Sequence, residues 1–241
     1  MRCITVASGK GGVGRSTVTA NLGIALSKLK KSTIVIDGTL TTPNLTLLFR
    51  LEKVVHTLND LLSGNASIED VTYDGPNGVK VIPAAVSLER IRKTQPEKLA
   101  EVVKLLPKKT SFVLIDAPGG LRRETIAALR AGKELLLVTT PEIPAVSDAI
   151  KTRIAGELFG LKPIGVVLNL VHEDRYELDR DQITNIMNLP VLAEIPYDEE
   201  ARKALGEGEP LIEAKPESRA SKAIIKLARK IIKMKPERKR K

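Results

Sequence analysis

Short runs of apolar residues alternate with stretches of helical periodicity along most of the chain. The runs are rich in Val, Ile and Leu and almost continuously apolar, which is typical of strands covered on both faces. Seven segments have this character: 3–8, 32–37, 78–84, 111–117, 134–140, 163–171 and 190–196. Helical spacing of apolar positions predicts helices between them, at 17–28, 57–63, 97–106, 123–131, 146–159 and 180–188.

The alternation of strand and helix predicts the fold class. Strands that alternate with helices are typical of a parallel sheet whose crossovers are right-handed. We therefore expect an α/β, doubly wound, mostly parallel sheet of seven or eight strands with helices on both faces. Ligands of such sheets bind at the carboxyl ends of the strands. The 241 residues contain no internal repeat, so we expect one domain over 1–232. Its last element is a helix at 218–235, and a basic, disordered tail is expected at 236–241.

The net positive charge of the chain comes from its C-terminal end. The net charge is +10, and residues 215–241 alone contain 12 basic and 2 acidic side chains, so the first 214 residues are neutral. Aromatic residues make up 2% of the chain and Trp is absent, which removes the stacking platforms used by single-strand binders. A sequence-specific nucleic-acid partner is therefore not expected.

The single cysteine, Cys3, excludes an internal disulfide and a Cys-x-x-Cys metal pair within the chain. Reduced surroundings are the simplest interpretation, and we expect a cytoplasmic protein. The C-terminal helix leaves one alternative open, a peripheral position on the inner face of the cell membrane.

That helix is amphipathic and basic. Its apolar positions recur at helical spacing, and lysines and arginines occupy the other faces. One interpretation is that 218–241 lies on an anionic membrane surface. The other is that the helix docks on the sheet with a solvated basic side, which the absence of Phe and Trp on the apolar face favours.

A glycine-rich segment, "GKGGVGRS" (Gly9–Ser16), follows the first strand and precedes a helix. It fits the phosphate-binding pattern G-x-x-x-x-G-K-[ST] at every fixed position except Arg15. Glycines allow successive N–H groups to turn toward phosphate oxygens, and the following helix adds its positive end. We expect the Ser16 hydroxyl to bind Mg²⁺. The residues expected to contact nucleotide are Gly9, Lys10, Gly11, Gly12, Val13, Gly14, Arg15, Ser16 and Thr17.

The loop also carries a second feature, a lysine at Lys10 in "KGGVG". This loop resembles the deviant Walker A motif of the MinD/ParA family of P-loop ATPases, whose fold is that of the nitrogenase iron protein. Further blocks agree in order: "VIDGTLTTPNL" (35–45), "LIDAPGGL" (114–121), "VTTPE" (138–142), "VVLN" (166–169) and "EIPYDEEARKALGEGEP" (194–210). The resemblance covers residues 3–232 and is strongest to archaeal MinD-like proteins.

The resemblance implies specific roles. Lys10 would reach the nucleotide of a second subunit, so that ATP is sandwiched in a homodimer; the alternative is a solvated charge. Lys10, Asp37 and Asp116 would serve catalysis, and Ser16, Asp37 and Asp116 would hold Mg²⁺. ATP or ADP would be the ligand, and an unidentified protein partner would receive the signal in cell division or spatial positioning. The residues implied at the base are Asn169, Pro196 and Asp198, although Asn169 could be a turn former.

Two residues depart from the family pattern. Arg15 replaces the loop lysine, and Thr39 stands where the family has the aspartate that orients the attacking water. Arginine is larger and planar, so the exchange is not conservative in a tight cradle. Together the changes favour ATP binding with slow hydrolysis. Ordinary hydrolysis remains the alternative if Arg15 and Asp37 take over the missing roles.

Three other functions stay open at this stage. A ParA-type DNA-partitioning ATPase shares the loop, but the neutral body argues against it. A pseudo-ATPase interaction scaffold fits the two departures. A carrier of metal clusters is disfavoured by the single cysteine.

Overall fold

The structure is a computed structural model that describes residues 1–85, 94–172 and 174–234. Within these residues, eight strands form one sheet in the order β3-β4-β2-β5-β1-β6-β7-β8. Every strand pair is parallel except β3 with β4. This confirms the predicted fold class. The strands are β1 (Arg2–Ala7), β2 (Thr33–Asp37), β3 (Tyr73–Asp74), β4 (Lys80–Ile82), β5 (Phe112–Asp116), β6 (Glu134–Thr139), β7 (Lys162–Val171) and β8 (Val191–Pro196).

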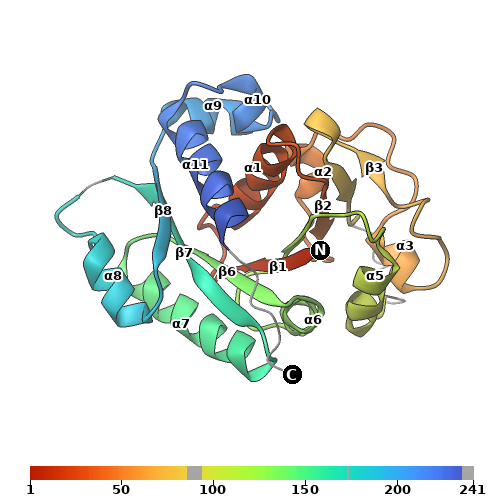
Figure 1. Cartoon of the computed structure of the whole chain (residues 1–241), viewed down its shortest axis with the longest axis horizontal. Coiled ribbons are helices and arrows are strands. Elements are labelled where there is room, and N and C mark those ends of the chain that lie inside the picture. Colours follow the sequence, from red (N-terminus) through yellow and green to blue (C-terminus); the bar gives the residue numbers. More distant parts are fainter. Residues whose placement is uncertain (86–93, 173, 235–241) are drawn as a thin grey trace.

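Helices cover both faces of the sheet (Figure 1). The helices are α1 (Arg15–Lys28), α2 (Leu45–Leu48), α3 (Leu58–Leu62), α5 (Leu99–Leu105), α6 (Arg123–Ala131), α7 (Ile143–Leu158), α8 (Arg180–Met187), α9 (Glu199–Gly206), α10 (Leu211–Ala214) and α11 (Arg219–Lys233). Two 3₁₀ turns, η1 (Pro76–Gly78) and η2 (Pro96–Lys98), lie in the connections.

The two faces bury two separate hydrophobic cores. In β1, Ile4 and Val6 pack into the core that contains α1 and α11, whereas Cys3 and Ala7 pack into the core that contains α6 and α7. Successive strand residues point to opposite faces, so an apolar strand can fill both cores at once. This explains the continuous apolar runs in the sequence.

The structure differs from the sequence-based expectations mainly in short elements. The helices α2, α9 and α10 and the strand β3 were not expected. Four residues are too few to show a helical period, which accounts for α2 and α10. The α9 helix begins after Asp198, which was expected at the base; Asp198 caps the helix by accepting a hydrogen bond from the Glu200 N–H at 3.0 Å.

The C-terminal helix α11 is docked on the body of the protein. Its apolar side packs against α1 and β8, next to the N-terminus of the chain (Figure 1). The buried residues are Ala220, Ser221, Ile224, Leu227, Ala228 and Ile231. Of the two interpretations of this helix, the structure therefore has the docked one. The tail at 236–241 lies outside the described residues.

Strand register brings two carboxylates together at the carboxyl edge of the sheet. Asp37 ends β2 and pairs with Asp116, which ends β5. Asp116 also lies in register with Val6 of β1, close to the start of the glycine loop. The strands β2 to β5 lie on one side of β1, and the strands β6 to β8 lie on the other. The strand order therefore reverses at β1, and the carboxyl end of β1 is the usual place for a ligand.

Candidate nucleotide-binding site

The glycine loop between β1 and α1 has a conformation that requires glycine at several points. Gly12 and Gly14 have φ values of +83° and +78°, in the left-handed region. A Cβ on Gly9 would lie 2.1 Å from the carbonyl carbon of Asp148, so the loop packs directly on the backbone of α7. The loop then turns into α1, whose first N–H groups have no partner within the helix. This is the geometry of an anion cradle.

Asn169, at the end of β7, holds this loop in place. Its Nδ2 donates a hydrogen bond to the carbonyl oxygen of Val13 at 2.9 Å and lies against Gly14. The side chain is 6% exposed. The structure thus gives Asn169 a positioning contact with the loop that the sequence did not reveal.

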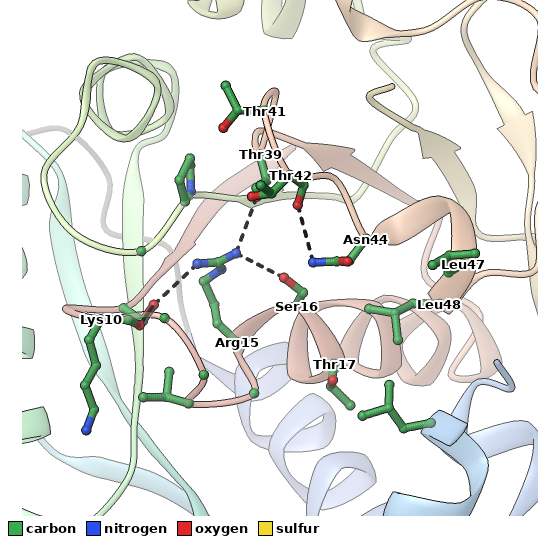
Figure 2. Close-up of a pocket in the computed structure, with 18 of the residues that line it drawn as sticks. Lys10, Arg15, Ser16, Thr17, Thr39, Thr41, Thr42, Asn44, Leu47 and Leu48 are labelled. Carbon is green, nitrogen blue, oxygen red and sulfur yellow. Dashed lines mark hydrogen bonds between the residues drawn. The ribbon is translucent and has the colours of Figure 1, made fainter. Parts of the chain in front are cut away.

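Lys10 extends away from the rest of the loop. Its side chain points away from Arg15 (Figure 2), and its ammonium group makes no hydrogen bond or ion pair with any described residue. The backbone at Lys10 and Gly11 is packed against Gly119, where a Cβ would lie 2.9 Å from the Gly11 nitrogen. The loop is therefore fixed while its lysine is available for an external group.

In contrast to the ammonium group of Lys10, the guanidinium group of Arg15 is buried among oxygen atoms. Its Nε and Nη2 bind the two carboxylate oxygens of Asp116 at 2.8 and 3.3 Å. Nη2 also lies 3.0 Å from the Ser16 hydroxyl and 3.4 Å from the Thr39 hydroxyl, and Nη1 lies 3.4 Å from the Ser8 hydroxyl. The side chains of Arg15 and Asp116 are only 9% and 1% exposed. Burial lowers the pKa of Arg15, but the charge and hydrogen bonds of Asp116 outweigh this effect. The pKa of Arg15 is therefore raised above its ordinary value.

The second carboxylate, Asp37, is held by backbone groups. Its oxygens accept hydrogen bonds from the N–H groups of Thr39 at 3.0 Å and Leu45 at 3.2 Å. Complete burial and the nearby charge of Asp116 raise the pKa of Asp37 to about 7. Asp37 therefore shapes the turn after β2.

The three residues expected to hold Mg²⁺ are Ser16, Asp37 and Asp116. Hydroxyl and carboxylate oxygens are the ligands that Mg²⁺ prefers. However, the Ser16 hydroxyl donates a hydrogen bond to Asp116 at 2.6 Å, and Arg15 contacts both groups. Each oxygen of Asp37 accepts one hydrogen bond from a backbone N–H group. In this arrangement the oxygen atoms of Ser16 and Asp116 bind a guanidinium and do not fit a metal ion.

No other metal site is evident in the part of the chain that the structure describes. Three or more His, Cys, Asp or Glu residues do not gather there in an arrangement that could hold an ion. The single cysteine is buried in β1.

A pocket of about 900 Å³ opens beside the glycine loop, a size typical of sites for small molecules. The loop from Lys10 to Thr17 forms its floor, together with Ser8, Pro118 and Gly119. Figure 2 shows how the segment after β2 faces the loop across the pocket. The lining residues outside the expected site include Thr41, Thr42, Asn44, Leu47, Leu48 and Arg122. The polar run "TLTTPN" directly after β2 was the signal, since it follows a strand at the carboxyl edge.

The residues expected around the base are not in the lining of this pocket. Pro196 ends β8, where it pairs with Val171. Asp198 accepts hydrogen bonds from the N–H groups of Glu200 and Ala220, both at 3.0 Å, and so joins the starts of α9 and α11. The part of the expected 194–210 segment that does line the pocket is 205–208, at the end of α9.

Comparison with known proteins agrees with this site. A family model described as ParA, NUBPL iron-transfer P-loop NTPase, matches residues 1–232. An uncharacterized ATP-binding protein of Methanocaldococcus jannaschii is 42% identical over 229 residues, which cover 95% of this chain and 87% of that protein.

Solved structures give the same result. The septum site-determining protein MinD of Pyrococcus horikoshii, complexed with Mg-ADP, superposes with a TM-score of 0.93 at 39% identity, covering 96% of each chain. A MinC:MinD cell division complex of Aquifex aeolicus has a TM-score of 0.82 at 26% identity, covering 100% of this chain and 99% of that one.

None of the described helices is both long enough and apolar enough to span a membrane.

The glycine loop, the strand order and the matches over nearly the whole chain all indicate the same family. The chain belongs to the ParA/MinD family of P-loop NTPases.

Proposed function

We propose that this protein is an ATP-binding switch, in which nucleotide binding joins two copies of the chain and the dimer then recruits a protein partner to a position in the cell. The observation that carries the proposal is the rigid glycine loop at the mouth of a 900 Å³ pocket. The loop offers main-chain N–H groups and a helix N-terminus to phosphate oxygens. The similar MinD from Pyrococcus horikoshii holds Mg-ADP, which supports a nucleotide as the ligand.

The free ammonium of Lys10 supports the dimer. It lies next to the cradle but makes no polar contact with the described residues of its own chain. A lysine with an unused charge beside a phosphate site can reach a phosphate bound by another subunit. Two pockets facing each other would then place each Lys10 at the partner's nucleotide.

Slow hydrolysis is the second part of the proposal. Thr39 offers a hydroxyl where a water-orienting carboxylate is expected from the family pattern, and that hydroxyl accepts from Arg15 at 3.4 Å. A hydroxyl is a far weaker base than a carboxylate. ATP would therefore stay bound long enough to serve as a signal.

A cytoplasmic protein fits the docked α11. The apolar side of this helix is buried, so it is not available to enter a membrane while the helix is docked. Contact with an anionic membrane would have to use the exposed basic side chains, for example Lys222 and Lys226. The MinC:MinD complex supports a protein as the partner.

Calorimetric titration with ATP, ADP and GTP tests ligand binding, with and without Mg²⁺. We expect ATP and ADP to bind more tightly than GTP by about tenfold or more, that is by about 1.4 kcal/mol. The absence of binding heat for all three nucleotides under both conditions would leave only an interaction scaffold.

Light scattering with ATP and with ADP tests the dimer. Lys10→Ala is the matched variant, because it removes the free ammonium and leaves the fold of the loop intact. We expect dimers with ATP in the unaltered protein and monomers in the variant, with ADP affinity retained. Equal dimer content in both proteins would contradict the role of Lys10.

Single-turnover hydrolysis tests the proposed impairment. Restoring a carboxylate in Thr39→Asp should raise the rate by about 10²-fold, the usual contribution of one positioned base. Thr39→Asn, which has the same shape without the charge, is the control. An unchanged rate in Thr39→Asp would mean that hydrolysis is not limited at this position.

A further inference from the structure

We infer that the guanidinium of Arg15 takes the place of the magnesium ion, so that this chain binds its nucleotide without a metal. The inference rests on the proposed function, since it specifies the form in which the nucleotide binds.

The first argument is the set of atoms around the guanidinium. Five oxygen atoms from four segments surround it: both carboxylate oxygens of Asp116 and the hydroxyls of Ser8, Ser16 and Thr39. Oxygen atoms of this kind are the ligands of a hard divalent cation. In a P-loop, the serine after the loop and the aspartate at the end of a neighbouring strand are the usual metal ligands. Here Ser16 and Asp116 are bound to each other and to Arg15.

The second argument is charge. A guanidinium keeps its charge at every physiological pH. Arg15 is 9% exposed and is paired with Asp116, whereas the neighbouring carboxylate, Asp37, accepts hydrogen bonds from backbone N–H groups. Without nucleotide, a divalent ion added to the same oxygens would bring the positive charge of this buried site to three, against the carboxylates of Asp116 and Asp37. Such an ion could enter only if the guanidinium left Asp116.

The third argument is the capacity of Arg15 to bind a ligand where it stands. A guanidinium has five N–H donors. Nη1 uses one of its two N–H groups on Ser8, and the second has no acceptor among the described residues. Arg15 also lines the pocket beside the glycine loop. A phosphate oxygen can therefore accept from Arg15 without breaking the pair with Asp116, as planar guanidinium groups commonly bind phosphate.

One rival arrangement must be separated from this one. The guanidinium could swing to the phosphates when nucleotide arrives, as a loop lysine would, and release Ser16 and Asp116 to Mg²⁺. Nucleotide binding would then depend on the metal. The two arrangements differ in this dependence, which can be measured without any change to the chain.

The experiment is a titration of the full-length protein with ADP, in buffer containing Mg²⁺ and in buffer containing EDTA. If Arg15 replaces the ion, the two dissociation constants should agree within about threefold, a difference below 0.7 kcal/mol. Arg15→Lys is the matched variant: the lysine keeps the charge but lacks the planar fork that binds both oxygens of Asp116. We expect Mg²⁺ to tighten ADP binding to this variant by about tenfold or more.

The outcomes are distinct. Binding in Mg²⁺ that weakens tenfold or more in EDTA, in the unaltered protein, overturns the inference and leaves the proposed function standing. No binding in either buffer overturns the proposed function itself. If Arg15→Lys fails to fold, the two titrations of the unaltered protein still decide between the arrangements.

Discussion

Two arginines of this protein lie at opposite edges of the same sheet, and each is bound by a carboxylate. At the amino edge, Arg2 of β1 binds both oxygens of Glu134 of β6 at 2.8 and 2.9 Å, and its Nη1 also binds the carbonyl oxygen of Ile231 at 2.5 Å. At the carboxyl edge, Arg15 binds both oxygens of Asp116. The exposed fractions of the two pairs are similarly low.

What differs is the remainder of each environment. Arg2 uses its other donors to cap the last turn of α11, where a cation is favoured by unpaired carbonyl groups and the helix dipole. Arg15 is surrounded by small hydroxyl side chains and borders a cavity. The same ion pair is thus a structural connection at one edge and part of a binding site at the other. The difference lies in whether the arginine faces packed chain or a pocket.

The largest effect is expected when Asp116 is removed. Asp116→Ala leaves the buried Arg15 without its carboxylate, and breaking such a pair costs about 3–5 kcal/mol of unfolding free energy. The double variant Arg15→Met with Asp116→Ala should recover more than half of the loss, because neither charge is then buried alone. Urea unfolding measures both. A double variant as unstable as the single one would show that the hydroxyl contacts, not the charge, stabilise this edge.

The amino edge should respond in stability alone. Arg2→Met keeps the length of the side chain but leaves Glu134 and the end of α11 unpaired, which we expect to cost about 2 kcal/mol in urea unfolding. Nucleotide affinity should stay the same. Lys80→Met is the control, since its ion pair with Asp74 is 45% and 77% exposed and should contribute no more than about 0.5 kcal/mol. A change of nucleotide affinity in Arg2→Met would show that the two edges are coupled.

Two glycines of the loop sharpen the comparison further. Gly14→Ala places a Cβ 2.2 Å from the Asn169 side chain at a φ of +78°, whereas Gly12→Ala has a similar φ with open space around the Cβ. Both variants carry the backbone strain, about 1 kcal/mol. Only Gly14→Ala should also displace Asn169, so it should be the less stable of the two in thermal unfolding. Equal melting temperatures would mean that Asn169 does not hold the loop.

The smallest effect concerns Cys3, which lies beside Arg2 at the amino edge. Burial raises the pKa of its thiol to about 12, so the thiolate needed for reaction is almost absent at pH 8. We expect no labelling by a disulfide reagent in the native protein over minutes, and complete labelling in urea. Rapid native labelling would show that this edge opens, in contrast to its packed appearance.

The periodicity of the sequence was enough to predict most of the fold. Continuous apolar runs identified seven of the eight strands, because burial on both faces leaves few polar positions in a strand. The strand β3 has two residues and α2 has four, and no pattern can be recognised over so short a length. The sequence of α11 leaves two positions open, because a helix with one apolar side has the same pattern on a protein and on a membrane.

The site was predicted only in part. The residues of the glycine loop were recognisable because their spacing follows from the shape of a phosphate. The contact of Asn169 with Val13 spans 156 positions of sequence and leaves no local signal. For the same reason, the sequence indicated the segment 194–210 but did not show that residues 205–208 of this segment line the pocket.

The sequence by itself determined the alternation of strand and helix and the glycine loop with its arginine. These features can be recognised from residues that are neighbours along the chain. Only the tertiary structure decided where that arginine points. Asp116 ends β5, which pairs with β1, and Thr39 follows β2, which pairs with β5; their oxygen atoms make the buried position of the guanidinium favourable. A charge is stabilised by the groups that surround it in space, and these groups lie far from it along the chain.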